Sequence, residues 1–466
     1  MAEQGEGSRV VTHPFDGNEV ATVAVPSADQ VERATAAAAA CAPTLTRTSA
    51  HTRAEALQQV SRTLAERAEE FTEVITAESG KPLHWAHAEV NRAVTVFRTA
   101  AEKARDRSGR VQHLDDHPNS RGGVALLRRV PRGPVLAIAP FSSPLSLVAH
   151  KVAPAFAVGT PIVVKPSSRT PVSALVLGEV LAEAGLPSGA FAVLPVNHET
   201  TFELVRDNRL PVVSFTGSGA AGWSVADCAP RKHTVLELGG NAAAVVLADW
   251  TDLDGAAQRI ATFGTYQTGQ SCLTVQRVVV QREIAAEFVD ALAAAVRALS
   301  TGDPYNPDVR VGPVVDEETA QRITSSIEAA VEAGATLLSG GTREGTTVEP
   351  TLLRDVPSDS EMWQREVYGP VLAVAVADSV DEALALVNDS EGGLRAGVFT
   401  HDLRVAFRAS AELEVDGVVI GDVPSDDADV AAQGAATSSG TGYGAVPAAM
   451  EELTHERLTV LNDALG

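Results

Sequence analysis

Between residues 135 and 217 the chain alternates between short apolar runs and helix-length segments, and this alternation constrains the fold more than any other feature. Four runs have the length and composition of buried strands: Val135–Ala139, Pro161–Val164, Phe191–Leu194 and Val212–Phe215. Helices are predicted over Ser146–Ala157 and Val172–Ala184, between these runs. Strands separated by helices of this length form a parallel sheet with helices on both faces. The sequence therefore predicts a doubly wound α/β domain.

A second α/β region is predicted from about Gly239 onward. Its elements are three helices and three strands: Ala256–Thr265, Arg282–Leu299, Glu317–Ala333, Val275–Val280, Val371–Val376 and Ala396–Phe399. A chain of 466 residues is too long for one compact core, because domains usually hold about 150 residues, and this length favours three domains or two with an appendage. The two α/β regions favour the second arrangement: two doubly wound α/β domains, one formed by residues 1–110 and 133–238 and the other by residues 239–420.

The segment before the first sheet is predicted to be helical. In Thr52–Ile75 apolar residues recur at spacings of three, four and seven, with charged residues between them. A second helical run covers about Ala86–Arg105. Between the two runs, Gly80 favours the end of one helix and Pro82 the start of the next.

A β-hairpin is predicted to project from this body. Residues Val111–Val135 hold two β-type stretches around the turn-rich segment His117–Gly123. The C-terminal segment Glu451–Leu461 has little core of its own, so we expect it to pack on this hairpin or on another subunit. Residues 111–132 and 443–466 are therefore predicted to form an oligomerisation arm.

The charge balance argues against several classes of partner. The sequence has 37 Lys and Arg against 60 Asp and Glu, a formal net charge of −23 at pH 7. Nucleic acids and anionic lipids both attract basic surfaces, so we expect neither partner. The longest apolar stretches, such as Val235–Leu247, are too short to span a bilayer.

The cysteines and histidines show neither a disulfide framework nor metal-ligand spacing, so no metal site is predicted. The first residues lack the features of a signal peptide. With thiols expected to stay reduced, a cytoplasmic location is predicted.

Two residues combine reactive chemistry with an unusual setting. Cys272, in Gly269-Gln-Ser-Cys272, stands between a helical segment and a strand, where its thiol can reach a cleft. A thiolate is a strong nucleophile, although a lone cysteine is more often a small core residue. Glu237 interrupts an apolar strand just before two glycines. It is either a buried carboxylate, whose raised pKa suits a general base, or a solvated side chain at a strand end.

A glycine pattern follows the last strand of the first predicted sheet. Gly217-Ser-Gly-Ala-Ala-Gly222 matches the spacing G-x-G-x-x-G, in which a tight turn leads into a helix whose N-terminus holds pyrophosphate. No acidic residue ends a second strand about 20 residues later, as the usual dinucleotide-binding fingerprint requires. The pattern therefore differs from the ordinary Rossmann fingerprint.

Six ordered groups of residues resemble those of the aldehyde dehydrogenase superfamily. They are Glu78-Ser-Gly-Lys-Pro82, Pro140-Phe-Ser-Ser-Pro144, Val164-Lys-Pro-Ser-Ser168, Phe215-Thr-Gly-Ser218, Glu237-Leu-Gly-Gly240 with Gly269-Gln-Ser-Cys272, and Glu366-Val-Tyr-Gly-Pro370. Together they span nearly the whole chain. Leu147–Pro154 and Pro166–Pro171 look most similar to the branch with lactaldehyde, phosphonoacetaldehyde and non-phosphorylating glyceraldehyde-phosphate dehydrogenases. The resemblance implies that the first domain binds the cofactor and that the second carries the thiol.

The resemblance also implies roles for individual residues. Cys272 would attack the aldehyde carbon to give a thiohemiacetal, which becomes a thioester when hydride passes to the nicotinamide. Glu237 would activate the water that hydrolyses this thioester and would also help to deprotonate Cys272. The implied cofactor-binding residues are Lys165, Ser168, Gly217, Ser218, Leu238, Glu366 and Tyr368, the last standing where the family usually has Phe.

The chain departs from the family pattern at several positions. Ser142 stands where the family has an Asn that contributes to the oxyanion hole, and loss of such a donor costs roughly 2.7–4 kcal/mol. Its shorter hydroxyl either substitutes, directly or through water, or contributes nothing and leaves a slow enzyme. Farther on, Gly421 and Thr437 replace an Asn and a Lys, and Tyr443-Gly-Ala445 replaces Arg-Glu-Gly. Substrate choice and assembly are therefore left open.

Cofactor and substrate preferences are predicted from a few further residues. Ser168 replaces a Glu that favours NAD, and Lys165 or Arg169 can pair with a 2′-phosphate, so NADP and NAD are both expected. Arg98 and His150 are predicted to hold an anionic group of the substrate. Alternatively, Arg98 forms a surface ion pair and His150 packs in the interior.

These observations predict an NAD(P)-dependent aldehyde dehydrogenase that oxidises a small aldehyde, anionic if Arg98 and His150 contact it, and that assembles as a homodimer or homotetramer. One alternative is a paralogue that binds nucleotide with impaired or no turnover, which the changes at Ser142 and Thr437 favour. Another is an acyl-transferring or reductive variant, which has less need of the base at Glu237.

Overall fold

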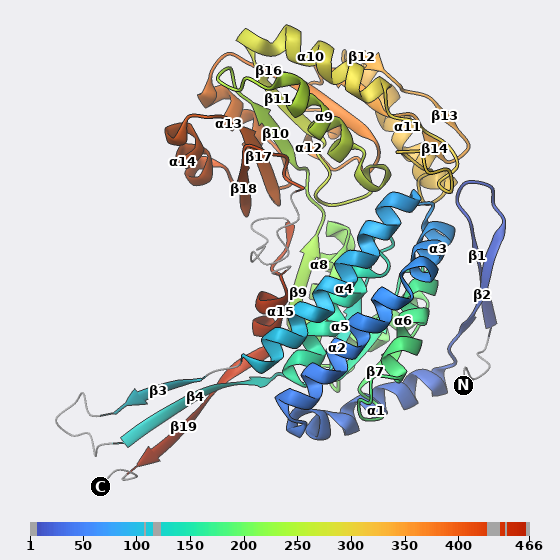
Figure 1. The fold of residues 1–466 in the computed structure, drawn as a ribbon, viewed down its shortest axis with the longest axis vertical. Helices are drawn as coiled ribbons and strands as arrows, with labels where there is room; N and C mark the ends of the chain where they lie inside the picture. Colours follow the sequence, from blue (N-terminus) through green and yellow to red (C-terminus); the bar gives the residue numbers. More distant parts are fainter. Residues whose placement is uncertain (1–6, 107–108, 115–122, 426–438, 443–444, 463–466) are drawn as a thin grey trace.

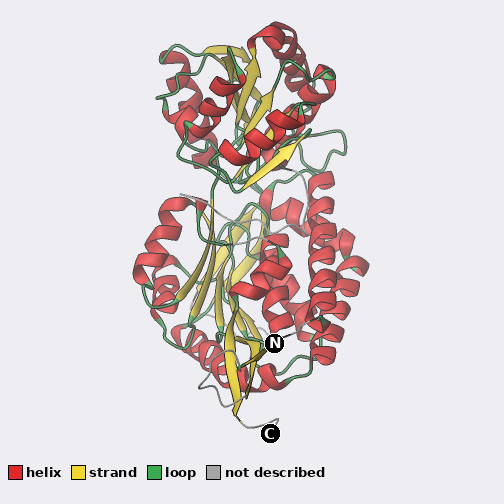
Figure 2. Ribbon diagram, turned by 90° about the vertical axis from the view of Figure 1, so that its left-hand side faces the viewer, coloured by secondary structure: helices red, strands yellow, loops and turns green. Residues whose placement is uncertain are grey.

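The computed structural model describes residues 7–106, 109–114, 123–425, 439–442 and 445–462. They form two lobes, one above the other, with a β-arm extending from the lower lobe (Figures 1 and 2). Residues 117–122 of the predicted hairpin turn lie outside the described residues, as do Thr437, Tyr443 and the chain end from residue 463, whereas Gly123 begins a strand.

The lower lobe is built on a five-stranded parallel sheet with the order β7-β6-β5-β8-β9. Its strands are β5 (Val135–Ile138), β6 (Ile162–Lys165), β7 (Phe191–Val193), β8 (Val212–Gly217) and β9 (His233–Leu238). Nine helices accompany it in the described part of the chain: α1 (Ala28–Arg47), α2 (Ala50–Glu66), α3 (Ala68–Ser79), α4 (Leu83–Arg105), α5 (Ser146–Val158), α6 (Val172–Ala182), α7 (His198–Arg206), α8 (Gly219–Cys228) and α15 (Val446–Glu452).

Both faces of this sheet are covered, because its strands are apolar on both sides. Val135 and Ala137 of β5 belong to a core shared with α2, α4 and α5, whereas Leu136 and Ile138 belong to a core shared with α7 and α8. The prediction of a doubly wound α/β fold is therefore confirmed.

The upper lobe holds a seven-stranded sheet with the order β12-β15-β16-β11-β10-β17-β18, parallel except for β12. Its strands are β10 (Ala243–Val246), β11 (Arg277–Gln281), β12 (Thr336–Ser339), β15 (Thr351–Arg354), β16 (Val371–Ala377), β17 (Arg395–Phe399) and β18 (Gly417–Ile420). Helices α9 (Leu253–Gly264), α10 (Arg282–Arg297), α11 (Glu317–Glu332), α12 (Glu361–Gln364), α13 (Val380–Asn388) and α14 (Leu403–Glu412) pack around it, and β13 (Arg343–Glu344) and β14 (Thr347–Val348) form a small hairpin.

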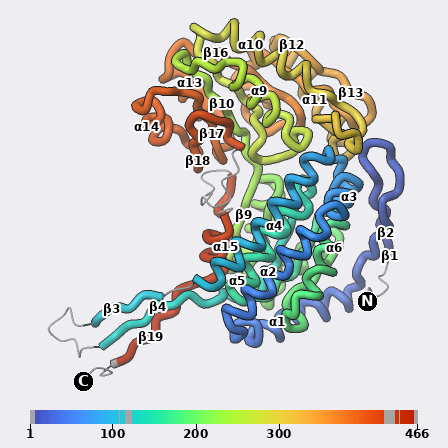
Figure 3. The backbone as a smooth tube through the Cα atoms, viewed as in Figure 1, coloured from blue at the N-terminus to red at the C-terminus, as the bar shows by residue number. Residues whose placement is uncertain are grey.

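The arm is a three-stranded antiparallel sheet with the order β19-β4-β3. Its strands are β3 (Arg110–His113), β4 (Gly123–Pro131) and β19 (Thr454–Asn462), and the C-terminal strand runs along β4 (Figure 3). Of the two packing partners considered for the tail, the structure shows the hairpin of the same chain.

Two local predictions needed correction. The helical run Thr52–Ile75 is two helices, because Arg67 leaves helical geometry (φ −100°, ψ 22°) between α2 and α3. The N-terminal residues are not all helical, since β1 (Gly7–Thr12) and β2 (Glu19–Val25) form an antiparallel hairpin. The predicted stop at Gly80 is confirmed: Gly80 caps α3 with a left-handed φ of 70°, and α4 begins at Leu83 after Pro82.

No described helix is long and apolar enough to cross a bilayer. The described residues also contain no group of three or more His, Cys, Asp or Glu side chains placed to hold a metal ion.

Candidate active site

A cavity of about 110 Å³ collects several of the predicted site residues where the two lobes meet. Cys272 comes from the upper lobe, Glu237 from the end of β9, Ser142 from the loop after β5 and His150 from α5. Leu238 lines the same cavity. Parallel strands bring their carboxyl ends to one edge of a sheet, which is where such sites form.

The Cys272 thiol follows a tightly constrained turn. The short 3₁₀ segment η1 (Tyr266–Gly269) contains Gln267 and Thr268 with positive φ values of 51° and 61°. Gly269 also has a positive φ (72°), and a Cβ there would lie 2.0 Å from the carbonyl carbon of Gly369. A strained backbone of this kind persists only where surrounding contacts hold it, so the position of the thiol is fixed by packing.

The thiol is strongly protonated in this environment. Burial, and then the negative charges of Glu366 and Glu237, raise the pKa of Cys272 to about 12, against the lowering effect of Arg92. The thiolate therefore needs further positive charge to form near neutral pH.

The pKa of Glu237 is lowered, whereas a raised pKa was expected if this carboxylate is buried. Burial acts to raise its pKa, but Lys151 and the Thr216 hydroxyl outweigh it, so the pKa of Glu237 lies below its usual value. Lys151 Nζ lies 3.3 Å from Glu237 Oε2 and donates to Ser214 Oγ at 2.8 Å. The Glu237 side chain is 26% exposed and accepts a hydrogen bond from Thr216. Glu237 is therefore ionised at neutral pH and ready to accept a proton.

The two glycines after Glu237 allow other groups to approach. A Cβ on Gly239 would lie 2.2 Å from Glu366 Oε2, and a Cβ on Gly240 would lie 2.9 Å from the Cys272 carbonyl oxygen. Gly240 also donates its backbone N–H to Glu366. The Gly-Gly pair thus lets the thiol loop and Glu366 pack against the end of β9.

The predicted cofactor residues lie along the carboxyl edge of the lower sheet. Lys165 ends β6, Gly217 ends β8, and Ser218 precedes α8 with its hydroxyl not used as a helix cap. A Cβ on Gly222 would lie 2.3 Å from Leu238, so this glycine lets α8 pack closely on β9. Ser168 lies partly exposed after β6. The N-terminus of α8 thus presents backbone N–H groups to an anion.

Glu366 reaches this edge from the upper lobe. Burial raises its pKa to about 8, although the Gly240 N–H and Arg322 act to lower it. Its Oε1 is buried and has no hydrogen-bond partner within the described part of the chain. Burial, and then Arg9 of β1, hold the pKa of Lys165 below its usual value. A buried carboxyl oxygen without a hydrogen-bond partner among the described residues, at the sheet edge that also carries Lys165 and the N-terminus of α8, fits a dinucleotide.

Comparisons with known proteins identify the family of the chain. The model of the "Aldehyde dehydrogenase family" matches residues 1–459. The chain belongs to the aldehyde dehydrogenase family. Members of this family are oxidoreductases that act on aldehydes, so the predicted enzyme class is confirmed.

Three relatives of this aldehyde dehydrogenase illustrate the range of similarity. A 3-sulfolactaldehyde dehydrogenase of Priestia aryabhattai is 36% identical over 454 residues, covering 97% of this chain and 94% of that protein. Aldehyde dehydrogenase 21 from Physcomitrella patens, solved with its reaction product succinate, superposes with a TM-score of 0.98 at 37% identity, covering 100% and 97% of the two chains. The NADP complex of NADP-dependent glyceraldehyde-3-phosphate dehydrogenase from Bacillus halodurans C-125 superposes with a TM-score of 0.95 at 33% identity, covering 98% and 96%.

One predicted substrate residue of this aldehyde dehydrogenase needs correction. Arg98 is exposed and does not line the cavity, whereas Arg92, six residues earlier on α4, does. Six residues correspond to a rotation of about 240° around a helix, so the two side chains face different directions. His150 lines the cavity, and its contact with an anionic group of the substrate stays a prediction.

Sequence reasoning also missed Lys151 and Tyr266. Lys151 interrupts the apolar helix Ser146–Val158, a visible signal of a buried charge with a partner. Tyr266 lines the thiol cavity and packs edge-on against Trp85, with ring centroids 4.7 Å apart.

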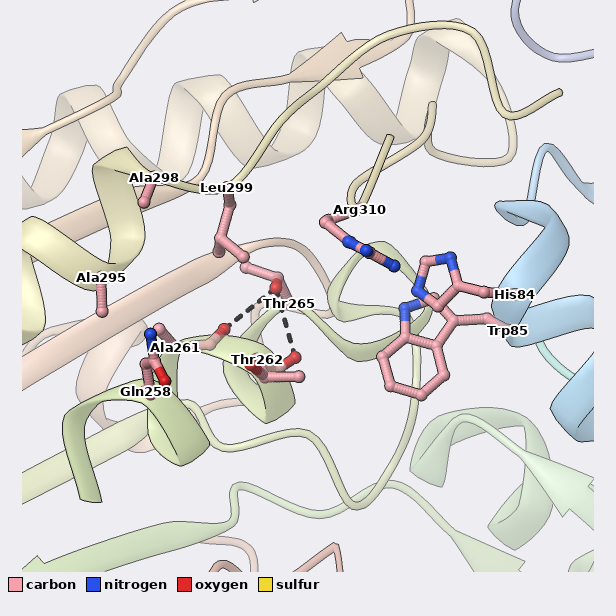
Figure 4. Close-up of a pocket in the computed structure, with 10 residues that line it drawn as sticks. All are labelled: His84, Trp85, Gln258, Ala261, Thr262, Thr265, Ala295, Ala298, Leu299 and Arg310. Atoms are coloured by element: carbon pink, nitrogen blue, oxygen red, sulfur yellow. Dashed lines mark hydrogen bonds between the residues drawn. The ribbon is translucent and has the colours of Figure 1, made fainter. Parts of the chain in front are cut away.

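Trp85 also lines a larger cavity, of about 450 Å³, which contains none of the predicted site residues (Figure 4). His84, Trp85 and Arg310 come together at one end of it, with the Arg310 guanidinium directed toward the two rings (Figure 4). Burial, and then Arg310, lower the pKa of His84 to about 4, so its imidazole is neutral at physiological pH.

Proposed function

We propose that this enzyme oxidises a small anionic aldehyde to its carboxylic acid with NADP or NAD. The observation that carries the proposal is the cavity that holds Cys272, Glu237 and Arg92 together. Lys165, Ser218 and Glu366 would hold the cofactor, whose nicotinamide supplies the acceptor for the hydride of the aldehyde.

Three residues of the chain, Cys272, Ser142 and Glu237, carry out the other steps of the reaction. The Cys272 thiol gives its proton to the ionised Glu237, which passes it to solvent, and Sγ bonds to the aldehyde carbon while the carbonyl oxygen takes up negative charge near Ser142 and the Cys272 backbone N–H. After loss of the hydride, the carbon is held as a thioester on Sγ. Glu237, ionised by its contacts with Lys151 and Thr216, accepts a proton from the water that attacks this thioester. The products are the carboxylic acid and the regenerated thiol.

An anionic substrate is supported by two independent observations. Arg92 and His150 line the cavity, and Arg92 is close enough to Cys272 to lower the pKa of its thiol. The names of the relatives describe sulfonated and phosphorylated aldehydes and the dicarboxylate product succinate. A guanidinium binds each of these anionic groups through charge-assisted hydrogen bonds.

The acceptance of NADP is supported by the residues around Lys165. Ser168 brings no negative charge, and Arg9 adds a second positive charge close to Lys165. Arg169 is engaged with Asp316 at 2.8 Å, so Lys165 and Arg9 are the cations we assign to a 2′-phosphate. Ser168→Glu should reduce kcat/KM for NADP about 10-fold or more relative to NAD.

The organisation of the chain follows from the same proposal. We assign residues 1–110 and 133–238 to cofactor binding, residues 239–420 to the thiol domain, and residues 111–132 and 443–466 to an arm that joins subunits of a homodimer or homotetramer. Apolar side chains on the arm support this assignment, since Val111 is 63% exposed and Leu458 is 57% exposed.

The test is an absorbance assay for reduced nicotinamide, with succinic semialdehyde, glyceraldehyde 3-phosphate and 3-sulfolactaldehyde beside neutral propanal. Turnover should disappear in Cys272→Ala. Arg92→Gln should lower the preference for anionic over neutral aldehydes about 10- to 100-fold, whereas Arg98→Gln, on an exposed face of the same helix, should leave it unchanged. The readout is the ratio of kcat/KM for anionic and neutral aldehydes, because Arg92 also lowers the pKa of the thiol and so affects both substrates. Equal losses of kcat/KM for the two kinds of aldehyde would contradict the assignment of Arg92 to the anionic group.

The raised thiol pKa favours one second candidate, a nucleotide-binding relative with impaired or no turnover. A cofactor-binding titration combined with a thiol-alkylation assay distinguishes the two functions. Tight cofactor binding with a Cys272 thiol that stays inert in the complex would support the second candidate.

A further inference from the structure

The Glu78-Ser-Gly-Lys-Pro82 motif covers the end of α3 and the short turn before α4. Glu78 is 1% exposed and Lys81 is 4% exposed, so the motif buries both of its charged side chains. A buried charge is costly unless it is paired or hydrogen-bonded. The proposed reaction uses neither residue directly, so their partners are the best guide to what the motif does.

The Glu78 carboxylate lies at the N-terminus of α6. Its Oε2 accepts a hydrogen bond from the Val172 N–H at 2.7 Å, and its Oε1 accepts one from the Ser173 N–H at 3.0 Å. The first N–H groups of a helix have no partner within the helix, and Pro171, the residue before α6, provides no side-chain cap. Glu78, which precedes Val172 by 94 residues, therefore replaces a local cap.

A second buried carboxylate, Glu89 of α4, lies at the N-terminus of α5. Its Oε1 accepts hydrogen bonds from the N–H groups of Leu145 at 2.9 Å and Ser146 at 3.0 Å. Glu89 is 2% exposed and forms an ion pair with Lys81 of the motif. Like α6, α5 has no side-chain cap of its own. The motif thus supplies one of the two capping carboxylates and holds the other.

The two capped helices follow two loops that the proposed function places at the active site. The loop before α6, residues 166–171, carries Ser168, whose lack of charge supports the binding of NADP. The loop before α5, residues 139–145, carries Ser142, near which the aldehyde oxygen takes up negative charge. A carboxylate that fixes the first N–H groups of a helix also fixes the point where the preceding loop ends.

The two loops also contact each other. Thr170 donates its hydroxyl to the Phe141 carbonyl at 3.3 Å, and the Phe141 ring packs edge-on against Tyr368, with centroids 5.9 Å apart. The hydrogen bond from Thr170 is longer than each of the four that the two carboxylates accept. Each loop is therefore expected to depend mainly on its own carboxylate.

We propose that Glu78 and Glu89 are positioning residues with separate tasks: Glu78 sets the loop of residues 166–171 for cofactor binding, and Glu89, held by Lys81, sets the loop that presents Ser142 to the aldehyde oxygen. This inference rests on the proposed aldehyde oxidation and identifies what fixes each loop. A change at either carboxylate should affect one step of the reaction more than the other.

The charge of the carboxylates suits this task. A helix N-terminus carries partial positive charge, and a hydrogen bond to an ionised acceptor is roughly twice as strong as a neutral one. Burial raises the pKa of Glu78 to about 7, although hydrogen bonds from Ser173 and Val172 act to lower it. Measurements at about pH 8.5 therefore keep this carboxylate ionised.

The test compares Glu78→Gln with Glu89→Gln, because each replaces one carboxylate by an amide of nearly the same shape. The Kd of NADP is measured by isothermal titration calorimetry, and kcat is measured at saturating cofactor. Glu78→Gln should raise the Kd about 10-fold and lower kcat less than about 3-fold. Glu89→Gln should lower kcat about 10-fold and raise the Kd less than about 3-fold.

Exposed Glu69 provides the matched control. It lies on α3 with Glu78, so Glu69→Gln removes the same charge from the same helix and should leave both the Kd and kcat unchanged. Glu78→Asp and Glu89→Asp keep the buried charge but shorten the side chain by one methylene. They should show the same division of effects to a smaller extent, and they replace the glutamine variants if those do not fold.

The possible results separate this inference from the proposed function. Equal changes of Kd and kcat in both variants would show that the two carboxylates only stabilise the lower lobe, and would overturn the inference. An unchanged Kd in Glu78→Gln, or an unchanged kcat in Glu89→Gln, would overturn the assignment of that residue and leave the proposed function intact. A wild-type enzyme without any Cys272-dependent turnover would overturn the proposed function and the assignment of Glu89, whereas the Kd of NADP would still decide the assignment of Glu78.

Discussion

The Cys272 thiol of the cofactor-free protein should react with iodoacetamide much more slowly than a free cysteine. At pH 8, a thiol with a pKa of about 12 is ionised to about one part in 10⁴, compared with about one part in 10 for the ordinary value of 9.0. A thiolate of higher pKa is also more nucleophilic, which recovers roughly 15- to 30-fold of this difference. The net expectation is a rate about 30- to 60-fold below that of N-acetylcysteine.

The causes of this pKa can be separated by substitution. Glu366 has a pKa of about 8, so Glu366→Gln should change the rate little at pH 7 and accelerate it several-fold above pH 9. Glu237 is ionised throughout this range because its pKa is lowered. Glu237→Gln should therefore accelerate alkylation by a similar factor at both pH values.

Alkylation is measured by mass spectrometry of the peptide that contains Cys272, which separates it from Cys41 and Cys228. Cys272→Ala provides the control for peptide assignment. The rate should keep rising about tenfold per pH unit up to pH 10 in wild type. A plateau with a midpoint below pH 9, or alkylation faster than that of N-acetylcysteine, would refute the argument that burial and the two carboxylates suppress the thiolate.

Three further predictions concern catalysis, stability and assembly. Lys151→Met should shift the acidic limb of the kcat/KM pH profile upward by about 1–2 pH units, because it removes the largest effect that opposes the burial of Glu237; an unchanged limb would contradict this. Glu89→Ala should destabilise the fold by about 3–5 kcal/mol in urea unfolding, since it leaves the buried Lys81 without its ion-pair partner; a change below about 1 kcal/mol would show that the pair is dispensable. Leu458→Glu on the arm should shift the protein to smaller species in native mass spectrometry, and an unchanged mass would remove the arm from the interface.

The architecture could be predicted from the sequence because it depends on local patterns. Apolar runs such as Val212–Phe215 are long enough for a buried strand and too short for a helix, and Gly80 is one of the few residue types that adopt a left-handed helix cap easily. The exceptions are also local: Arg67 divides a helical pattern whose apolar spacing continues across the break.

The candidate site was only partly predictable. Cys272, Glu237, Ser142 and His150 were expected together, and they line one cavity. The sequence of α4 does not show which of its faces is turned toward the cavity. Arg98 was therefore predicted to contact the substrate, whereas the structure places Arg92 at the cavity and Arg98 on an exposed face.

The sequence alone determined which residues bear reactive groups and in which strand, helix or turn they stand, because side-chain chemistry and hydrophobic periodicity are properties of neighbours along the chain. Only the tertiary structure decided how those groups behave. The pKa of Glu237, on a strand, falls because Lys151 of helix α5 and the Thr216 hydroxyl outweigh its burial, and Ser143 of the lower lobe donates to Gln267 of the upper lobe. Electrostatic and hydrogen-bonding energies depend on distances through space, and those distances are set by packing between elements far apart in the chain.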